Sequence, residues 1–323
     1  AVAAAAPTAP GVRALLARPK ALQVPSHALP TRMAASRPAD PSVPHDRADP
    51  REDLRAAVRD AVEALYDIES SDRAFHRQRL SLAEIERDFT QEVDNRLTYG
   101  EFDLDFFLDL VDSTEPRPGE VFCDLGSGCG RLVVAAALAG YPWKEAVGLE
   151  LLESLHAIAA RTHAALEPLA AEADDLSLRP CRFLHGDGFA HLRRLGRAQE
   201  PGAPTWVLFC YSTCMPSVGP YLCQLSEALG TSLPLGSRVA TTDKQLVSDD
   251  AHRRWAFREV ARMEKANYNT LTSVGYVYEL VEGGDPRAAN VGAAASMPAG
   301  PLTQVNSRAP LGALGAGPGP APT

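Results

Sequence analysis

Residues 124–130, DLGSGCG, place an acidic side chain ahead of three glycines at alternate positions. Glycine has no β-carbon, so it allows tight backbone turns and the close approach of a ligand to the chain. The segment follows a short apolar run, EVFCDL, and precedes a helical stretch, RLVVAAALAG. A glycine turn between a buried strand and a helix is a typical ligand-binding turn in α/β proteins.

The residues around this turn argue against two common ligands. The dinucleotide pattern GxGxxG requires a glycine at the position that Arg131 occupies, and no GK[ST] follows for a phosphate-binding loop. Asp124 would repel a phosphate at the helix N-terminus, whereas it would attract a cation. The turn is therefore predicted to hold a nucleoside with a positive charge and no phosphates.

Two further carboxylates are expected beside this turn. Glu150 ends the run EAVGLE, and Asp187 follows the run CRFLH. A carboxylate at the end of the second strand can accept hydrogen bonds from both ribose hydroxyls. Asp187 is placed to accept one from an amino group such as that of adenine. A cation, a ribose and an adenine together indicate S-adenosylmethionine as the cofactor.

The elements that must position these side chains follow from the spacing of apolar residues. Helical spacing occurs in residues 51–66 and 82–97, and again in the segment DLDFFLDLVDS. Apolar strands then alternate with helices, which indicates an open parallel sheet covered on both faces. The five runs are EVFCDL, EAVGLE, CRFLHGD, TWVLFCYS and SRVATTD.

The end of the folded region has a different pattern. FREVARMEKAN and SVGYVYELV alternate apolar and polar residues across a short connection, so they can pair only in antiparallel orientation, with Tyr276 and Tyr278 on one face. The sequence thus predicts an α/β fold. It has an open, mostly parallel seven-stranded sheet, a C-terminal antiparallel hairpin and an N-terminal helical cap.

Composition divides the chain into three parts. Residues 1–50 are rich in Ala and Pro, and residues 283–323 are mostly Gly, Ala and Pro, so both are predicted to be disordered. Residues 51–282 are predicted to form one domain, with a helical cap at 51–98 and the α/β core at 99–282.

Charge and composition also restrict the classes of partner and the cellular environment expected for this chain. The formal net charge of -9 argues against intrinsic affinity for nucleic acid, and no apolar run is long enough to span a membrane. Six cysteines without a CxxC pair or a secretory signal favour reduced thiols in an intracellular compartment, with neither a metal nor a disulfide framework.

The N-terminal segment is compatible with more than one cellular compartment. Residues 1–39 carry five basic residues and no acid, which resembles a plastid or mitochondrial transit peptide. The same bias arises in any leader rich in Ala and Pro, in which case the protein is nuclear or cytoplasmic. Met33 is a second candidate for the first residue of the protein.

Several motifs together resemble a known family. LTYGEFDLDFFLDLVD precedes FCDLGSGCG, and GLE, HGDGF, VLFCYSTCM and GSRVATT follow in order. The glycine turn with its carboxylates resembles the Rossmann-type S-adenosylmethionine-dependent methyltransferases. Within them, this order resembles the catalytic domain of the non-SET histone lysine methyltransferases, the disruptor-of-telomeric-silencing family. The resemblance runs from about Tyr99 to Asp243.

The resemblance implies a site for the cofactor. A loop over its methionine end would contain Tyr99, Gly100, Glu101 and Phe102. The turn from Asp124 to Gly130 would cradle the methionine and ribose, Glu150 would hold the ribose, and Asp187 with Gly188 would border the adenine. The turn residues so implied are Asp124, Gly126, Ser127, Gly128 and Gly130.

Three departures from the family pattern bear on specificity. Phe102 stands where the family has Thr, and Gly188 stands where it has an aromatic residue. Tyr211, Ser212 and Thr213 replace paired Asn residues and an aromatic at the end of the fourth strand. Tyr211 and Ser212 are the candidates for positioning the acceptor through their hydroxyls, although Tyr211 could instead be a packed strand-end residue.

These features predict a methyltransferase that acts on a protein side chain, with lysine as the favoured acceptor. Methyl transfer from a sulfonium mainly requires alignment and the exclusion of water, so neither a nucleophilic triad nor a metal is needed. A small-molecule methyltransferase and a cofactor-binding module without activity are the alternatives.

Overall fold

A computed structural model describes residues 50–66, 72–88, 97, 99–172, 178–197, 202–266 and 272–284. The predicted disordered leader and tail lie outside these residues, apart from Pro50, Gly283 and Gly284. No helix in the described ranges is long and apolar enough to cross a membrane.

Seven strands form one sheet in the order β3-β2-β1-β4-β5-β7-β6. The first five strands pair in parallel, and β7 pairs antiparallel with both β5 and β6. This confirms the predicted mostly parallel sheet and its C-terminal hairpin, in which Tyr276 and Tyr278 stack with centroids 6.2 Å apart. The strands are β1 (Val121–Leu125), β2 (Glu145–Glu150), β3 (Cys181–His185), β4 (Trp206–Cys210), β5 (Arg238–Thr242), β6 (Trp255–Lys265) and β7 (Ser273–Glu282).

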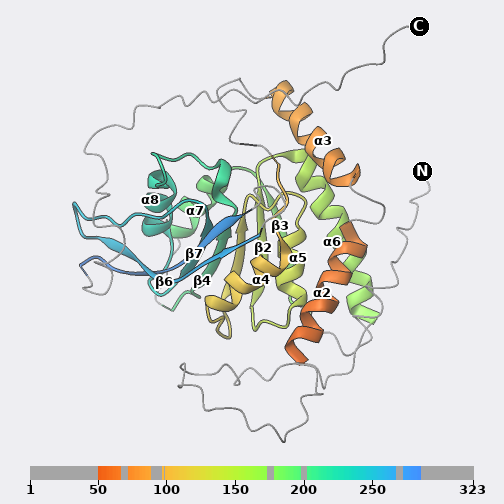
Figure 1. Ribbon diagram of the computed structural model, residues 1–323, viewed down its shortest axis with the longest axis horizontal. Coiled ribbons are helices and arrows are strands. Elements are labelled where there is room, and N and C mark those ends of the chain that lie inside the picture. Colours follow the sequence, from red (N-terminus) through yellow and green to blue (C-terminus); the bar gives the residue numbers. More distant parts are fainter. Residues whose placement is uncertain are drawn as a thin grey trace, which may run out of the picture.

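Helices cover both faces of the sheet (Figure 1). One core joins α2, α4, α5 and α6 to one face, and a second joins α7 and α8 to the other. The helices are α2 (Pro50–Tyr66), α3 (Asp72–Asp88), α4 (Leu104–Ser113), α5 (Arg131–Leu138), α6 (Glu153–Glu172), α7 (Gly188–Arg197) and α8 (Cys223–Ser232). Between β4 and α8 lies a short 3-10 turn, η3 (Ser212–Cys214).

The order of the strands places a crevice at the centre of the sheet. The chain runs outward from β1 to β3, then returns to add β4 on the other side of β1. The connections therefore leave β1 and β4 toward opposite faces, and the space between them opens at their carboxyl ends. This is the edge to which the sequence assigned Asp124 and Glu150.

Helix α2 is fastened to α4 by a row of ion pairs. Arg51, Arg55 and Arg59 lie one turn apart on α2 and pair with Asp112, Asp109 and Asp105 of α4. Buried Val58 and Val62 of α2 join the same apolar core as α5. The helix thereby fixes the start of α4, which follows directly after the predicted loop at residues 99–102.

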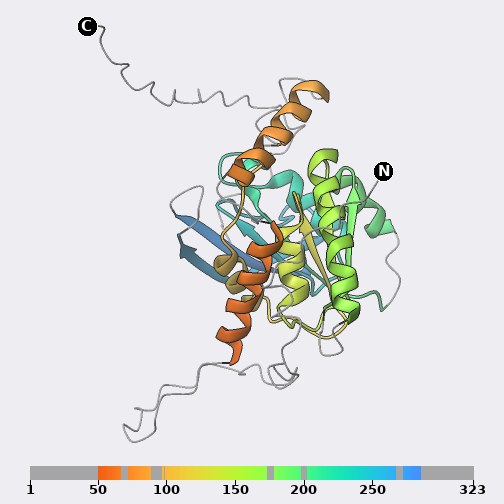
Figure 2. The ribbon, with the colours of Figure 1, turned by 90° about the vertical axis from the view of Figure 1, so that its right-hand side faces the viewer.

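The second cap helix begins earlier than predicted. Apolar spacing suggested a helix over residues 82–97, whereas α3 spans Asp72–Asp88, and residues 89–96 and 98 lie outside the described residues. Polar side chains hold this helix: Arg77, Ser81 and Glu84 are all buried. Apolar spacing cannot reveal a helix that is fixed mainly by charged contacts. In both views α3 lies at the upper end of the fold, beside the start of α6 (Figures 1 and 2).

A buried ion pair secures the opposite end of the sheet. The side chains of Glu120 and Arg238 are each 3% exposed and form a salt bridge between the start of β5 and the turn before β1. Arg238 also donates to the carbonyl of Thr114 at 3.0 Å, and Glu120 accepts from Thr205 Oγ1 at 2.6 Å.

Replacing Arg238 with Met should destabilise the protein strongly, because it leaves the Glu120 carboxylate buried without its cation. We expect a loss of about 3–5 kcal/mol in the free energy of unfolding, measured by urea denaturation. Arg182→Met is the control, because the pair between Arg182 and Glu145 is more exposed and should contribute at most about 1 kcal/mol. Equal losses in the two variants would contradict this account.

Candidate active site

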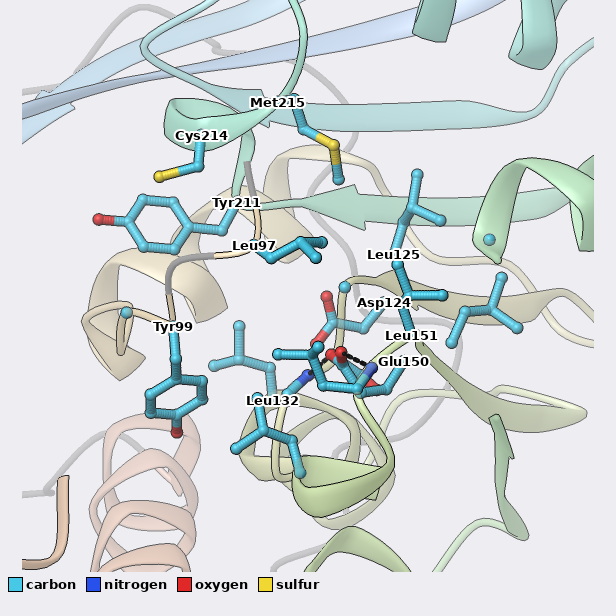
Figure 3. A pocket seen from close by; sticks show the side chains of 18 of the residues that line it. Leu97, Tyr99, Asp124, Leu125, Leu132, Glu150, Leu151, Tyr211, Cys214 and Met215 are labelled. Atoms are coloured by element: carbon cyan, nitrogen blue, oxygen red, sulfur yellow. Dashed lines mark hydrogen bonds between the residues drawn. The ribbon is translucent and has the colours of Figure 1, made fainter. Parts of the chain in front are cut away.

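A cavity of about 300 Å³ lies at the carboxyl ends of the central strands (Figure 3). Its walls come from the loop at residues 99–102, the glycine turn, the ends of β2 and β4, and the starts of α6 and α7. Twelve of the fourteen residues predicted for the site line it. They are Tyr99, Gly100, Glu101, Phe102, Asp124, Gly126, Ser127, Gly128, Glu150, Asp187, Gly188 and Tyr211.

The glycine turn depends on backbone conformations that favour glycine. Gly126, Gly128 and Gly130 have φ values of +84°, +54° and +89°, a region that side chains disfavour. A β-carbon on Gly128 would lie 2.7 Å from the ring of Tyr99, so that ring packs directly on the turn. The turn thus lets Tyr99 form one wall of the pocket.

Gly130 has a different place from the one predicted. It does not line the cavity, and a β-carbon there would meet the ring of Phe183 at 2.6 Å. Gly130 is also the N-terminal cap of α5. Its lack of a side chain lets α5 pack closely against β3, so it shapes the turn without reaching a ligand.

Glu150 ties the glycine turn to the second strand. Its Oε2 accepts a hydrogen bond from Gly128 N at 2.7 Å, and its Oε1 accepts one from Leu152 N at 2.8 Å (Figure 3). Burial raises the pKa of this carboxyl, and the backbone hydrogen bonds oppose that shift. Glu150 therefore orders the turn and still presents oxygen atoms to the cavity, where a ribose could donate to them.

Asp124 is a buried carboxyl group without a neutralising partner. It is 3% exposed, and no Lys, Arg or His among the described residues forms an ion pair with it. Burial, together with the charge of Glu150, raises its pKa from 3.8 to about 8. Figure 3 shows both carboxylates at the same side of the pocket. A cationic ligand would favour the ionised form.

The buried polar atoms of the cavity fit an adenosyl cofactor. Ser127 Oγ is buried and has no hydrogen-bond partner among the described residues, and such atoms usually find one in a ligand or water. Together with Asp124 and Glu150 it offers sites for a cation and for hydroxyl groups. The glycine turn leaves room for a ligand to approach the backbone.

The loop over the cavity is held by charges. Glu101 accepts hydrogen bonds from Arg77 Nε at 2.8 Å, Arg131 Nη1 at 2.9 Å and Tyr99 Oη at 3.0 Å. Asp103, directly after the loop, caps α4 by accepting from Phe106 N at 2.8 Å. The loop is therefore fixed from α3, α4 and α5 at once.

The wall at the third strand contains an aromatic residue that the sequence analysis missed. Asp187 and Gly188 line the cavity, and so does Phe189. Asp187 Oδ1 accepts from Phe189 N at 2.9 Å, which orders the start of α7. The motif HGDGF contained this signal: the aromatic side chain lies one position after the expected one. Gly188 is tightly confined, because a β-carbon there would lie 2.3 Å from Leu125 Cδ1.

Only one of the two acceptor-positioning candidates reaches the cavity. Tyr211 lines it and packs on Phe102, with ring centroids 5.1 Å apart. Ser212 is fully buried, and its hydroxyl donates to the carbonyl of Thr242 at 2.5 Å. Ser212 thus joins η3 to β5 and does not face a substrate, because the chain turns inward directly after β4.

Other residues complete the cavity without having been predicted. Two of them differ most from the predicted set: Arg131 brings a positive charge to the cavity, and Met215 brings a flexible apolar side chain. The sequence signal was weak, because contacts between distant elements bring these side chains together. The remaining ones are Leu97, Leu125, Cys129, Leu132, Leu149, Leu151, Leu152, Leu155, Cys214 and Pro216.

The cysteines and acids form no further site in the described ranges. All six cysteines are unpaired, and no group of three or more His, Cys, Asp or Glu residues could hold a metal ion.

Comparison with known families agrees with this geometry. Residues 83–184, about a third of the chain, match the family described as histone methylation protein DOT1. The matched region includes the loop at Tyr99, the glycine turn and Glu150. Over this region the chain resembles the DOT1 family of S-adenosylmethionine-dependent methyltransferases. Curated proteins gave no match.

Solved structures with a similar arrangement include several methyltransferases. An RNA methyltransferase from Salinibacter ruber in complex with S-adenosylhomocysteine is 25% identical, with a TM-score of 0.32 over 55% of this chain and 90% of its own. The rRNA methyltransferase aviRa from Streptomyces viridochromogenes is 16% identical, with a TM-score of 0.39 over 56% and 86%. A methyltransferase from Thiobacillus denitrificans is 19% identical, with a TM-score of 0.30 over 53% and 58%.

Asp124→Asn should stabilise the cofactor-free protein at pH 8 while weakening cofactor binding. Because its pKa is raised from 3.8 to about 8, Asp124 contributes stability below pH 4 that is lost as the pH rises through 8. Asn has no such titration. We expect a gain of about 0.5–2 kcal/mol at pH 8, measured by denaturation.

The same substitution should remove a proton release on binding. In the wild type, S-adenosylmethionine favours ionised Asp124, so calorimetry below pH 8 in buffers of different ionisation enthalpy should detect a released proton that the variant lacks. Unchanged proton release in Asp124→Asn would show that another group faces the cation.

Gly128→Ala should reduce cofactor affinity by forcing the Tyr99 ring away from the turn. We expect at least a loss of about tenfold, or 1.4 kcal/mol, by calorimetry with S-adenosylhomocysteine. Gly119→Ala is a matched control: Gly119 also has a positive φ, +84°, but has nothing within 4 Å of its β-carbon position and lies outside the cavity. If both variants lost affinity equally, the contact with Tyr99 would be irrelevant to binding.

Proposed function

We propose that this methyltransferase transfers a methyl group from S-adenosylmethionine to a lysine side chain of a protein. The observation that carries the proposal is the family match over residues 83–184. It includes both the loop at Tyr99 and the glycine turn, two walls of the same cavity. The family is described by the methylation of histones, and we carry over the class of acceptor, a protein lysine.

The end of the cavity near η3 supports an acceptor with an aliphatic stem. Its side chains are aromatic or weakly polar, and they include Phe102, Tyr211, Cys214, Met215 and Pro216. None of these carries a negative charge, so none of them offers an ammonium group a carboxylate partner. Burial in such surroundings lowers the pKa of an amine. A lysine that enters there is therefore favoured in the neutral form that methyl transfer requires.

The chemistry needs little from the protein beyond alignment. When bound, the sulfonium supplies a methyl group that is already activated, and its sulfur keeps the electron pair of the broken bond. The residues of the loop at 99–102 exclude water from the reacting atoms, and the Tyr211 hydroxyl orients the entering nitrogen. The new nitrogen–carbon bond leaves a surplus proton on the amine, which passes to solvent.

A small-molecule methyltransferase is the second candidate. The observation that favours it is that Tyr211, Ser212 and Thr213 replace the paired Asn residues of the family pattern. The ring of Tyr211 packs on Phe102 and occupies part of that end of the cavity. A compact acceptor needs less room there than a peptide.

The decisive experiment follows the labelled methyl group. The purified protein is incubated with S-adenosylmethionine labelled on its methyl carbon and with a cell lysate from which nucleic acid has been removed. We expect label in protein, recovered as methyl-lysine after acid hydrolysis. A Glu150→Ala variant, which lacks the carboxylate that orders the glycine turn, controls for methyltransferases in the lysate. Label found only in metabolites would support the second candidate and overturn the first.

A further inference from the structure

Glu101 lies between two arginines from different helices. Arg77 of α3 donates to its Oε1 through both Nε and Nη2, and Arg131 of α5 donates to its Oε2. All three side chains are largely buried, with exposures of 7% for Arg77, 13% for Arg131 and 17% for Glu101. One carboxylate is therefore shared by two guanidinium groups.

The two arginines differ in what they face. Arg131 lines the cavity, whereas Arg77 does not, and Arg77 Nη1 instead donates to the carbonyl of Tyr66 at 2.9 Å. Among these three side chains, two positive charges stand against one negative charge. Arg77, which does not line the cavity, already neutralises part of the negative charge of Glu101. Part of the positive charge of Arg131 therefore remains available to a ligand in the cavity.

We propose that Arg77 is a positioning residue for the amino-acid end of the cofactor: by holding and neutralising Glu101, it leaves Arg131 available to bind a carboxylate in the cavity. The inference rests on S-adenosylmethionine as the cofactor. It adds a residue of the helical cap, outside the cavity, to those that determine affinity for it.

Another group in the same cavity agrees with this assignment. Asp124 is buried there without a cation from the described residues, and Arg131 brings a guanidinium group to the same cavity. An amino acid carries one ammonium and one carboxylate group, and the cavity offers it the buried carboxyl group of Asp124 and the guanidinium group of Arg131. An arginine can bind a carboxylate through two parallel hydrogen bonds, and Arg131 uses only Nη1 in its bond to Glu101.

Removal of Arg77 would lower the positive charge that Arg131 can offer to a ligand. Of these two arginines, Arg131 alone would then remain to pair with Glu101, and that pair would be neutral overall. A ligand carboxylate would have to compete with Glu101 for the same guanidinium group. The affinity for a ligand without a carboxylate would not change.

The test compares two ligands that differ only at the amino-acid end. S-adenosylhomocysteine carries the carboxylate and ammonium groups, and 5′-methylthioadenosine lacks both. For Arg77→Met, calorimetry should show affinity for S-adenosylhomocysteine reduced by about tenfold to a hundredfold, with affinity for methylthioadenosine within about twofold of the wild type. The ratio of the two affinities is measured on the same protein, so partial loss of folding does not alter it.

Three further variants separate a charge effect from a merely structural one. Glu101→Gln removes the competing charge, so it should raise the ratio above that of the wild type. Arg77→Met combined with Glu101→Gln should restore much of the ratio that Arg77→Met loses. If Arg77 served only to hold the loop, the double variant would bind as poorly as the single one. Arg77→Lys, which keeps the positive charge, should recover part of the affinity.

Arg79→Met is the matched control, because Arg79 lies on the same helix and is exposed. It loses the same charge and should leave both affinities unchanged. Equal losses for both ligands in Arg77→Met, or a double variant no better than the single one, would overturn the proposal. Failure of the wild type to bind either ligand would instead refute the cofactor. The lysine assignment does not affect any of these measurements.

Discussion

Two carboxyl groups, Asp124 and Glu150, are buried together at the carboxyl end of the central strands without a cation from the described part of the chain. Burial of such groups is costly unless they are paired or protonated. Glu150 is compensated by the backbone of Gly128 and Leu152. For Asp124, burial and the charge of Glu150 raise the pKa to about 8, with no opposing hydrogen bond from the described residues, so it takes up a proton more readily. The cavity is thereby prepared for a positive charge that the cofactor supplies. This destabilising arrangement is of the kind found at functional sites.

The rest of the fold holds this arrangement in place from several directions. The reversal of strand order between β1 and β4 opens the crevice. Helix α3 contacts two sides of the cavity: Arg77 holds the loop at Glu101, and Glu84 caps α6 by accepting from Glu153 N and Ser154 N. Ile85 of the same helix packs with Leu152 and Leu155, which line the cavity. The helical cap is thus part of the site, because it orients residues that face the cofactor.

Sequence patterns predicted the sheet better than the cap. Short apolar runs bounded by turns fix buried strands, and the close spacing of the last two required an antiparallel pair. Helix α3 began ten residues before its predicted start because charged residues, and not an apolar stripe, anchor it. In the site, the glycine turn and the strand-end acids were found from their spacing. Ser212 and Gly130 were placed in the site, yet the structure turns both away from the cavity. Phe189 and Arg131 were missed, since their positions depend on how α7 and α5 begin.

The sequence by itself determined the class of fold and the kind of cofactor. Both depend on local signals: alternation of buried strands and helices, a turn that only glycine allows, and acids placed directly after strands. Only the tertiary structure decided which of those residues share one cavity and which charges remain unbalanced there. Glu101 receives its two guanidinium partners from positions 24 residues before it and 30 after it. No local sequence pattern predicts these contacts, because they arise from the packing of α3 and α5 around the loop between them.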